Sequence, residues 1–191
     1  MKSVSYLLMA AMVVFLSAQL VQGQTSMSKE ALIEKGEYLI MIAGCHDCHT
    51  PKKMTPEGPV PNMQLKLSGH PQDADLPDFD PSDVGPGKWV LLNESLTAFV
   101  GPWGMTFSPN LTPDKQTGIG LWTEQNFIKA MRTGKHMGTG RPILPPMPWT
   151  NLKNAKTEDL KAMFAYLKSI KPIKNLVPGP VPAEKLAEIN Q

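Results

Sequence analysis

The chain has few cysteines, little net charge, and no long apolar run beyond its N-terminal segment. Its 19 basic residues nearly balance 17 acidic ones, and a net charge of +2 provides no broad positive field to attract nucleic acid. Hydrophobic residues make up 41% of the 191 residues, which excludes a disordered chain and is enough for a core. At this length we expect one domain, with room for a long insertion, rather than an assembly of domains.

The N-terminal residues predict export. Lys2 precedes an apolar stretch at 6–16, and an apolar residue at 21 and a small one at 23 suit cleavage by a signal peptidase. We predict cleavage after Gly23, which makes residues 1–23 a signal peptide and the mature protein periplasmic or otherwise exported. An uncleaved anchor is the alternative, but polar residues interrupt the run before it reaches the roughly 20 residues of a spanning helix. We therefore expect membrane association only through partner proteins.

Apolar residues at helical spacing predict three helices, so we expect an all-α fold. Local signals set their bounds: Thr123 is a cap residue, Gly134 offers the left-handed conformation that ends helices, and Pro172 stops the last helix. The three helices are expected at 29–43, 123–134 and 157–170. They belong to a domain at 24–175, which a proline-rich C-terminal tail at 176–191 follows.

Proline and glycine are frequent in the roughly 80 residues between the first two helices, a length far above that of ordinary loops. We treat residues 51–109 as an insertion in the helical domain. Within it, residues 88–92 and 95–100 flank Asn93 and Glu94 and predict a small β-hairpin. The proline spacing of residues 172–182 predicts an extended segment on the surface.

The residues that carry chemistry lie directly after the first predicted helix. Cys45, Cys48 and His49 form the pattern C-x-x-C-H, the spacing that attaches a c-type haem. Two thiols three residues apart can each add to a vinyl group on one edge of the porphyrin, and the adjacent imidazole then binds the iron. We predict one covalent haem c, held by thioethers of Cys45 and Cys48, with His49 as an axial ligand of the iron.

Three other chemistries use two cysteines at this spacing. An exported chain permits a disulfide between Cys45 and Cys48, and a redox-active pair would place a thiol at a helix N-terminus. A zinc site needs four ligands, and no second C-x-x-C or H-x-x-H pattern lies downstream. Export together with the complete five-residue motif favours haem attachment over all three.

An iron held by histidine on one face needs a second axial ligand for electron transfer. Met147 lies between Pro146 and Pro148, which restrict its backbone, so we predict that its sulfur is the sixth ligand. Met137 lies in a glycine-rich turn and is the second candidate. Met131 lies on a helix face and is expected in the core.

Several basic residues lie near the haem-binding segments in sequence. They either steer an acidic partner to the haem edge or are solvated surface residues with no such role. They are Lys52, Lys53, Lys129, Arg132, Lys135 and Arg141. The remaining histidines are expected on the surface: His46, His70 and His136.

In these features the chain resembles class I cytochromes c. It has C-x-x-C-H after a first helix, a proline-framed methionine before a last amphipathic helix, and Gly36 where those helices would cross. Four segments are similar to the monohaem domains of cytochrome subunits of bacterial membrane-associated dehydrogenases, namely residues 110–120, 122–123, 132–134 and 146–148. The resemblance covers about residues 29–175 and implies a three-helix cytochrome c core around one covalent haem. It carries over the haem-binding residues Cys45, Cys48, His49 and Met147.

We therefore expect an electron-transfer protein rather than an enzyme. The expected function is one-electron transfer by an exported monohaem cytochrome with His/Met ligation, as a subunit or partner of a dehydrogenase. A terminal oxidase or reductase is the expected partner that accepts the electron. The alternative is a haem-based sensor of small ligands or a haem enzyme, and either needs an open sixth position.

Overall fold

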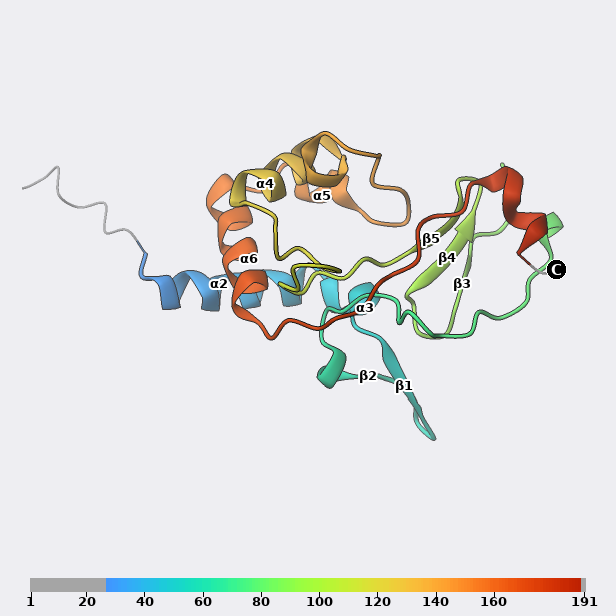
Figure 1. Cartoon of the computed structure of the whole chain (residues 1–191), viewed down its shortest axis with the longest axis horizontal. Coiled ribbons are helices and arrows are strands. Elements are labelled where there is room, and N and C mark those ends of the chain that lie inside the picture. The colour runs from blue at the N-terminus through green and yellow to red at the C-terminus, as the bar shows by residue number, and fades with distance from the viewer. Residues whose placement is uncertain (1–26, 190–191) are drawn as a thin grey trace, which may run out of the picture. The chain divides into compact units, whose positions relative to one another are not determined.

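The computed structural model describes residues 27–189 (Figure 1). The predicted signal peptide at 1–23 lies outside the described residues. Residues from Leu32 onward form one compact unit, which contains both hydrophobic cores that the described residues form. Within residues 27–189, every helix is too short or too polar to cross a bilayer.

The three predicted helices are present, close to their predicted bounds. They are α2 (Lys29–Ile42), α4 (Glu124–Thr133) and α6 (Thr157–Ser169). Thr123 caps α4, because its hydroxyl accepts a hydrogen bond of 3.1 Å from the N–H of Asn126, whose side chain accepts one from the N–H of Thr123. Gly134 ends this helix with a φ of 65°. Two short helices that the sequence did not reveal are α3 (Cys45–His49) and α5 (Trp149–Leu152).

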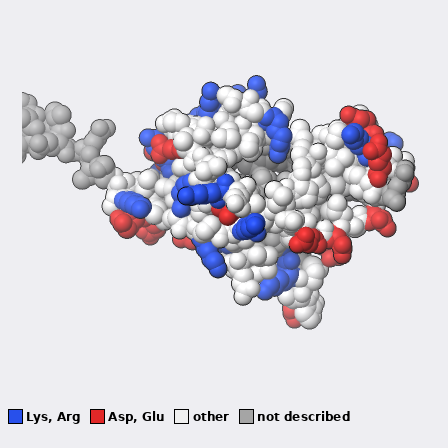
Figure 2. Space-filling view, viewed as in Figure 1, with Lys and Arg blue, Asp and Glu red and all other residues white. Residues whose placement is uncertain are grey.

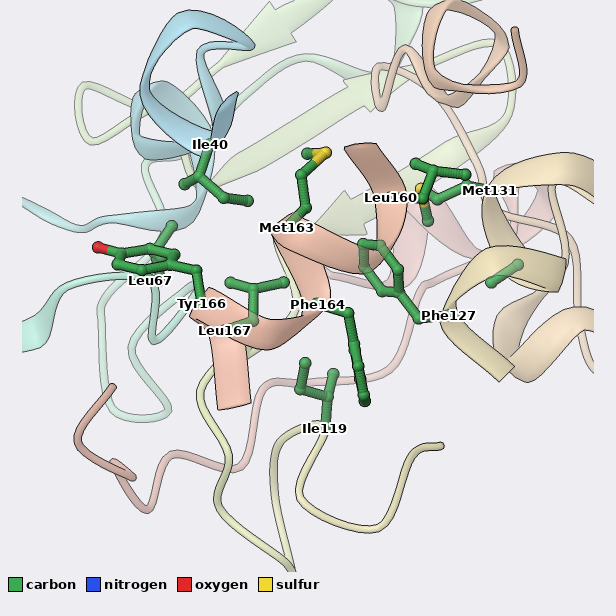
Figure 3. Packing of buried hydrophobic residues seen from close by; sticks show 11 residues of the cluster. Ile40, Leu67, Ile119, Phe127, Met131, Leu160, Met163, Phe164, Tyr166 and Leu167 are labelled. Carbon is green, nitrogen blue, oxygen red and sulfur yellow. The ribbon is translucent and has the colours of Figure 1, made fainter. Parts of the chain in front are cut away.

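Helices α2, α4 and α6 enclose the first hydrophobic core (Figure 3). Four apolar residues of α6 are at most 8% exposed, namely Leu160, Met163, Phe164 and Leu167. The ring of Phe164 lies against that of Phe127 in α4, with centroids 5.5 Å apart, and Ile40 of α2 is buried as well. Burying a side chain of this size contributes about 1.5–3 kcal/mol, so this core is a main source of stability.

Gly36 of α2 lies against the backbone of α6, as the resemblance implied. A Cβ atom at this position would be 2.0 Å from the carbonyl oxygen of Ala162. Gly36→Leu should therefore lower the free energy of unfolding by about 3 kcal/mol or more, since the helices must separate to admit a side chain. Thermal unfolding measures this loss, with Gly179→Leu as the control because no heavy atom lies within 4 Å of a Cβ there. Equal unfolding midpoints for the two variants would contradict the close helix contact.

The fold is mixed rather than all-α as predicted, because the long insertion forms two small antiparallel sheets. The predicted hairpin is present but shorter, with β3 (Leu91–Leu92) paired to β4 (Ala98–Gly101). Strand β5 (Gly104–Phe107) extends this sheet, and a separate hairpin consists of β1 (Lys52–Thr55) and β2 (Gly58–Pro61). The strands beyond the predicted hairpin are only four residues long, too short for a clear two-residue period, and β2 contains two prolines.

A second hydrophobic core joins the insertion to the C-terminal tail. Its buried residues are Val84, Val100, Met105 and Leu186. The tail is extended through its proline-rich start, as predicted, and Val181 then exchanges backbone hydrogen bonds of 2.8 and 2.9 Å with Met105 of β5. We call residues 71–109 and 176–189 the second-core region, and residues 32–70 and 110–175 the first-core region.

His70 is buried, so the prediction of a surface position was wrong. It is 1% exposed, its Nδ1 is hydrogen-bonded to the Thr97 hydroxyl at 2.9 Å, and its ring centroid lies 4.9 Å from that of Phe107. Both partners are distant in sequence and the segment has no periodicity, so no local pattern indicated burial. The loss of water lowers the pKa of His70 below its ordinary value.

This lowered pKa predicts a pH dependence of stability. The unfolded chain binds a proton at His70 near pH 6.5, whereas the folded protein resists protonation until a lower pH. The free energy of unfolding should fall as the pH drops below about 6.5, by at most about 1.4 kcal/mol for each unit between the two pKa values. Unfolding midpoints measured from neutral to mildly acidic pH record this loss. His70→Gln should flatten the profile, and an unchanged slope would show that His70 does not cause it.

Candidate functional site

The motif residues form the short helix α3 directly after α2. Gly44 separates the two helices with a φ of 67°, a left-handed conformation that glycine adopts without strain. Its carbonyl oxygen accepts a hydrogen bond of 3.0 Å from the N–H of Asp47, which starts the new helix. Residues three apart are neighbours on a helix, so Cys45 and Cys48 lie on one side of α3. Two thioether bonds to one porphyrin edge need this arrangement.

The two thiols are half-buried and are not bonded to each other. Burial raises the pKa of the Cys45 thiol to about 11 and also raises the pKa of Cys48. A redox-active pair depends on a lowered thiol pKa, so these cysteines lack that activation. Among residues 27–189, no three side chains of His, Cys, Asp or Glu are grouped to hold a metal ion, so the zinc alternative finds no ligand set there.

His49 is prepared to act as a ligand through one ring nitrogen. It is 5% exposed, and its Nδ1–H donates a hydrogen bond of 2.9 Å to the carbonyl oxygen of Pro109. A carbonyl oxygen only accepts, which assigns the proton to Nδ1 and leaves the lone pair on Nε2 free for a metal. Burial lowers the pKa of His49 to about 4, so the ring is neutral near pH 7. The structure therefore brings Cys45, Cys48 and His49 together on α3, a short helix that was not predicted.

The Pro109 carbonyl is held in place by the segment that contains Gly69 and His70. The N–H of His70 donates to the carbonyl oxygen of Ser108 at 2.9 Å, and the N–H of Gly69 donates to that of His49 at 2.8 Å. Gly69 has a φ of 79°, and a Cβ atom there would be 2.4 Å from the Ser108 carbonyl oxygen. Sequence analysis missed Pro109 and Gly69, because a backbone acceptor and a glycine at a close approach have no side-chain signature.

Met147 lies on a separate segment that is anchored on both sides. The Thr106 hydroxyl of β5 donates to the carbonyl oxygen of Pro145 at 2.9 Å. On the other side, the Trp149 indole packs on Gly134, where a Cβ atom would be 2.4 Å from the ring. Met147 itself is half-buried and packs against the first core. These two contacts restrict the position of the Met147 sulfur. The role of Met147 as the second iron ligand stays a prediction.

The other candidate methionines differ from Met147 in their surroundings. Met131 is 7% exposed and lies in the first core, as predicted. Met137 is 37% exposed and has a φ of 53°, a conformation that is unfavourable for a side chain of this size. A strained, exposed turn holds a methionine sulfur less rigidly than the anchored loop of Met147 does, so Met137 is the poorer candidate ligand.

Three of the six basic residues near the motif donate to backbone oxygens. Lys52 donates to the carbonyl oxygen of Asp47, Arg132 to that of Lys153, and Arg141 to that of Pro142. Four of the six are exposed, namely Lys53, Lys129, Lys135 and Arg141. On the face of the molecule that Figure 2 shows, Lys and Arg side chains gather over the part that carries α4, α5 and α6. A hollow lies beside α5 on the same face.

These residues fit a covalently bound haem. Its attachment needs two adjacent thiols that are free to react, and both are present on α3. Its iron needs a neutral imidazole with one free nitrogen, which the hydrogen bond from His49 to Pro109 provides. An anchored thioether on a second segment supplies a soft donor.

Comparison with known proteins points to the same chemistry, although no protein-family model matches the chain. The chain is 30% identical to the gluconate 2-dehydrogenase cytochrome c subunit of Pantoea cypripedii over 139 residues, which are 73% of this chain and 23% of that protein. It is 28% identical to the cytochrome c subunit of the quinone alcohol dehydrogenase of Gluconobacter oxydans over 145 residues, 75% of this chain and 23% of that subunit. It is 28% identical to the fructose dehydrogenase cytochrome subunit of Gluconobacter japonicus over 142 residues, 74% of this chain and 22% of that protein.

The chain spans less than a quarter of the length of each of these three relatives. The similarity to these cytochrome subunits nevertheless extends over about three quarters of this chain. Most of the chain is therefore homologous to cytochrome c subunits of bacterial dehydrogenases, in agreement with the resemblance of its motifs.

Proposed function

We propose that the protein is an exported monohaem c-type cytochrome that carries one electron at a time. Cys45 and Cys48 would hold the haem through thioethers, and His49 and Met147 would bind its iron. Homology to cytochrome c subunits supports electron transfer as the function. The observation that carries the proposal is the buried, neutral imidazole of His49, whose Nδ1–H is fixed on the Pro109 carbonyl.

The cysteines would attach the cofactor without an oxidant. Each thiol would add across one vinyl group, with its sulfur on one vinyl carbon and its hydrogen on the other. Their separation of one helical turn matches two groups on one porphyrin edge. Because both sulfurs lie on α3, attachment through them would also let His49 of the same helix bind the iron.

When bound, the haem supplies reversible one-electron chemistry between Fe(III) and Fe(II). The Pro109 carbonyl orients the His49 ring and increases the basicity of its free nitrogen. The soft sulfur of Met147 would favour Fe(II) and raise the reduction potential. Ligation by both residues would leave no open position for substrates or small ligands.

The proposed electron donor is a dehydrogenase, and the proposed acceptor is a terminal oxidase or reductase. Relatives that are named as dehydrogenase subunits support the choice of donor. The exposed basic residues Lys53, Lys129, Lys135 and Arg141 would attract an acidic docking surface. The basic and apolar pattern of residues 1–23 supports export to the periplasm, where these partners would be met.

A redox titration of the purified mature protein, followed by visible absorbance, tests this function. We expect one haem per chain that stays attached after denaturation and a single reversible one-electron transition. Mass spectrometry of the denatured chain measures the attachment independently. Haem that separates from the denatured chain would contradict the thioethers, and a protein without a reversible transition would contradict the carrier function.

A further inference from the structure

Charge is divided unequally between the two regions of the protein. The second-core region holds eight acidic and two basic residues, whereas the first-core region holds fifteen basic and eight acidic ones. The nearly neutral chain thus combines a region of net charge −6 with one of +7. Figure 2 shows this division on one face, where acidic side chains gather over the part that carries β3, β4 and β5.

The second-core region, which is acidic, exposes apolar side chains next to its carboxylates. Trp89 is 74% exposed, and Val90 and Leu92 are 46% and 56% exposed. The N–H of Trp89 donates to the carbonyl oxygen of Asp83 at 3.1 Å, so these two residues are neighbours. The aspartates of this segment are all exposed, namely Asp73, Asp75, Asp78, Asp80 and Asp83. An exposed tryptophan among charged residues has the composition of an interface anchor.

The first-core region, which is basic, contains a groove whose lining is apolar and positively charged, opposite in charge to the surface around Trp89. The groove has a volume of about 450 Å³ and is lined by Met63, Gln64, Lys66, Ile170, Lys171 and Ile173. Three apolar side chains form its walls and two lysines supply positive charge. Lys171 has no hydrogen bond or ion pair within residues 27–189, and Lys66 donates to the Tyr166 hydroxyl rather than to a carboxylate.

We propose that the protein associates with itself head to tail through these two surfaces. Trp89 of one copy enters the groove between Met63 and Ile170 of a second copy, and the carboxylates beside Trp89 face Lys171. Opposite charges steer the encounter, and burial of the indole adds attraction at short range. The groove volume is within the range of small-molecule sites, so it admits an indole ring.

This contact joins two different surfaces, so a dimer keeps one free surface of each kind, one on each copy. Association of this type continues beyond dimers unless it closes into a ring. Assemblies would bring several haem sites together and permit electron exchange between copies. That consequence rests on the proposed function, whereas the association itself does not.

Sedimentation velocity of the mature holoprotein tests the association. At about 20 mM salt, the average mass should rise above that of one chain, and beyond two chains, as the protein concentration increases to about 1 mM. At about 500 mM salt, the mass should return towards one chain, because the charges are screened. A single chain at every concentration in low salt would overturn the proposal and leave the acidic surface to another partner.

Two variants identify the surfaces. Trp89→Ser removes the anchor and Lys171→Glu reverses a charge at the groove, so each should weaken association roughly tenfold or more. Both residues are exposed, and an unchanged visible spectrum confirms that each variant folds. Leu121→Ser is the matched control, because Leu121 is 71% exposed but lies outside both surfaces, and it should associate as the wild type does.

Mixing the two variants distinguishes a head-to-tail contact from a symmetric one. Trp89→Ser keeps an intact groove and Lys171→Glu keeps an intact Trp89, so one complete contact can form between them. The mixture should reach the mass of two chains and no more, at concentrations where each variant alone is still a monomer. A mixture that remains monomeric, or Trp89→Ser protein that associates like the Leu121→Ser control, would overturn the proposed pairing.

Discussion

The double variant Cys45→Ser/Cys48→Ser should contain no covalent haem and should fail to reach the native fold. The first core consists of three modest helices, and long irregular segments surround it. A group that binds only the folded state adds its binding free energy to stability. Its loss should remove a large part of the about 5–15 kcal/mol that stabilises a domain.

Haem-stained denaturing gels and circular dichroism measure the two parts of this prediction. The stain reports covalent haem, and the helical signal reports folding of α2, α4 and α6. Met137→Ala, which leaves the motif intact, is the control and should stain and fold as the wild type does. A double variant that still stains would disprove the attachment, and one that loses the stain but keeps its helical signal and unfolding midpoint would disprove the link to folding.

Met147→Ala should lower the reduction potential and open the iron to external ligands. Removing the soft sulfur removes a preference for Fe(II), and the expected fall is on the order of 0.1–0.3 V within the roughly 0.8 V span that axial ligands set. Alanine also leaves the sixth position free, so the reduced variant should bind carbon monoxide. Redox titration and the visible spectrum with carbon monoxide measure the two effects.

Met137→Ala separates the predicted ligand from the second candidate. Met137 is exposed and lies in a strained turn, so its removal should change neither the potential nor carbon monoxide binding. If Met137→Ala lowers the potential and Met147→Ala does not, the ligand assignment is wrong while the carrier function survives.

The helices could be predicted from the sequence because their determinants are local. Thr123 and Gly134 bound α4 through contacts within a few residues, and the apolar spacing of α6 marks the face that is buried. The motif at Cys45, Cys48 and His49 is local as well, since all three residues lie on one short helix.

The features that escaped prediction depend on contacts between distant segments. His70 is buried because Thr97 and Phe107 surround it, and His49 is oriented by a carbonyl 60 residues away at Pro109. The second core forms only when the C-terminal tail reaches β5 through Val181. Neither a helical period nor a turn signal encodes such pairings.

The absorbance spectrum of the wild-type protein, with and without carbon monoxide, tests most directly whether His49 and Met147 both bind the iron. The oxidised protein should show the weak near-infrared charge-transfer band from sulfur to iron. The reduced protein should keep its visible spectrum when carbon monoxide is added, because both axial positions are occupied. A missing band together with avid carbon monoxide binding would contradict the carrier account and favour a sensor or enzyme with an open sixth position.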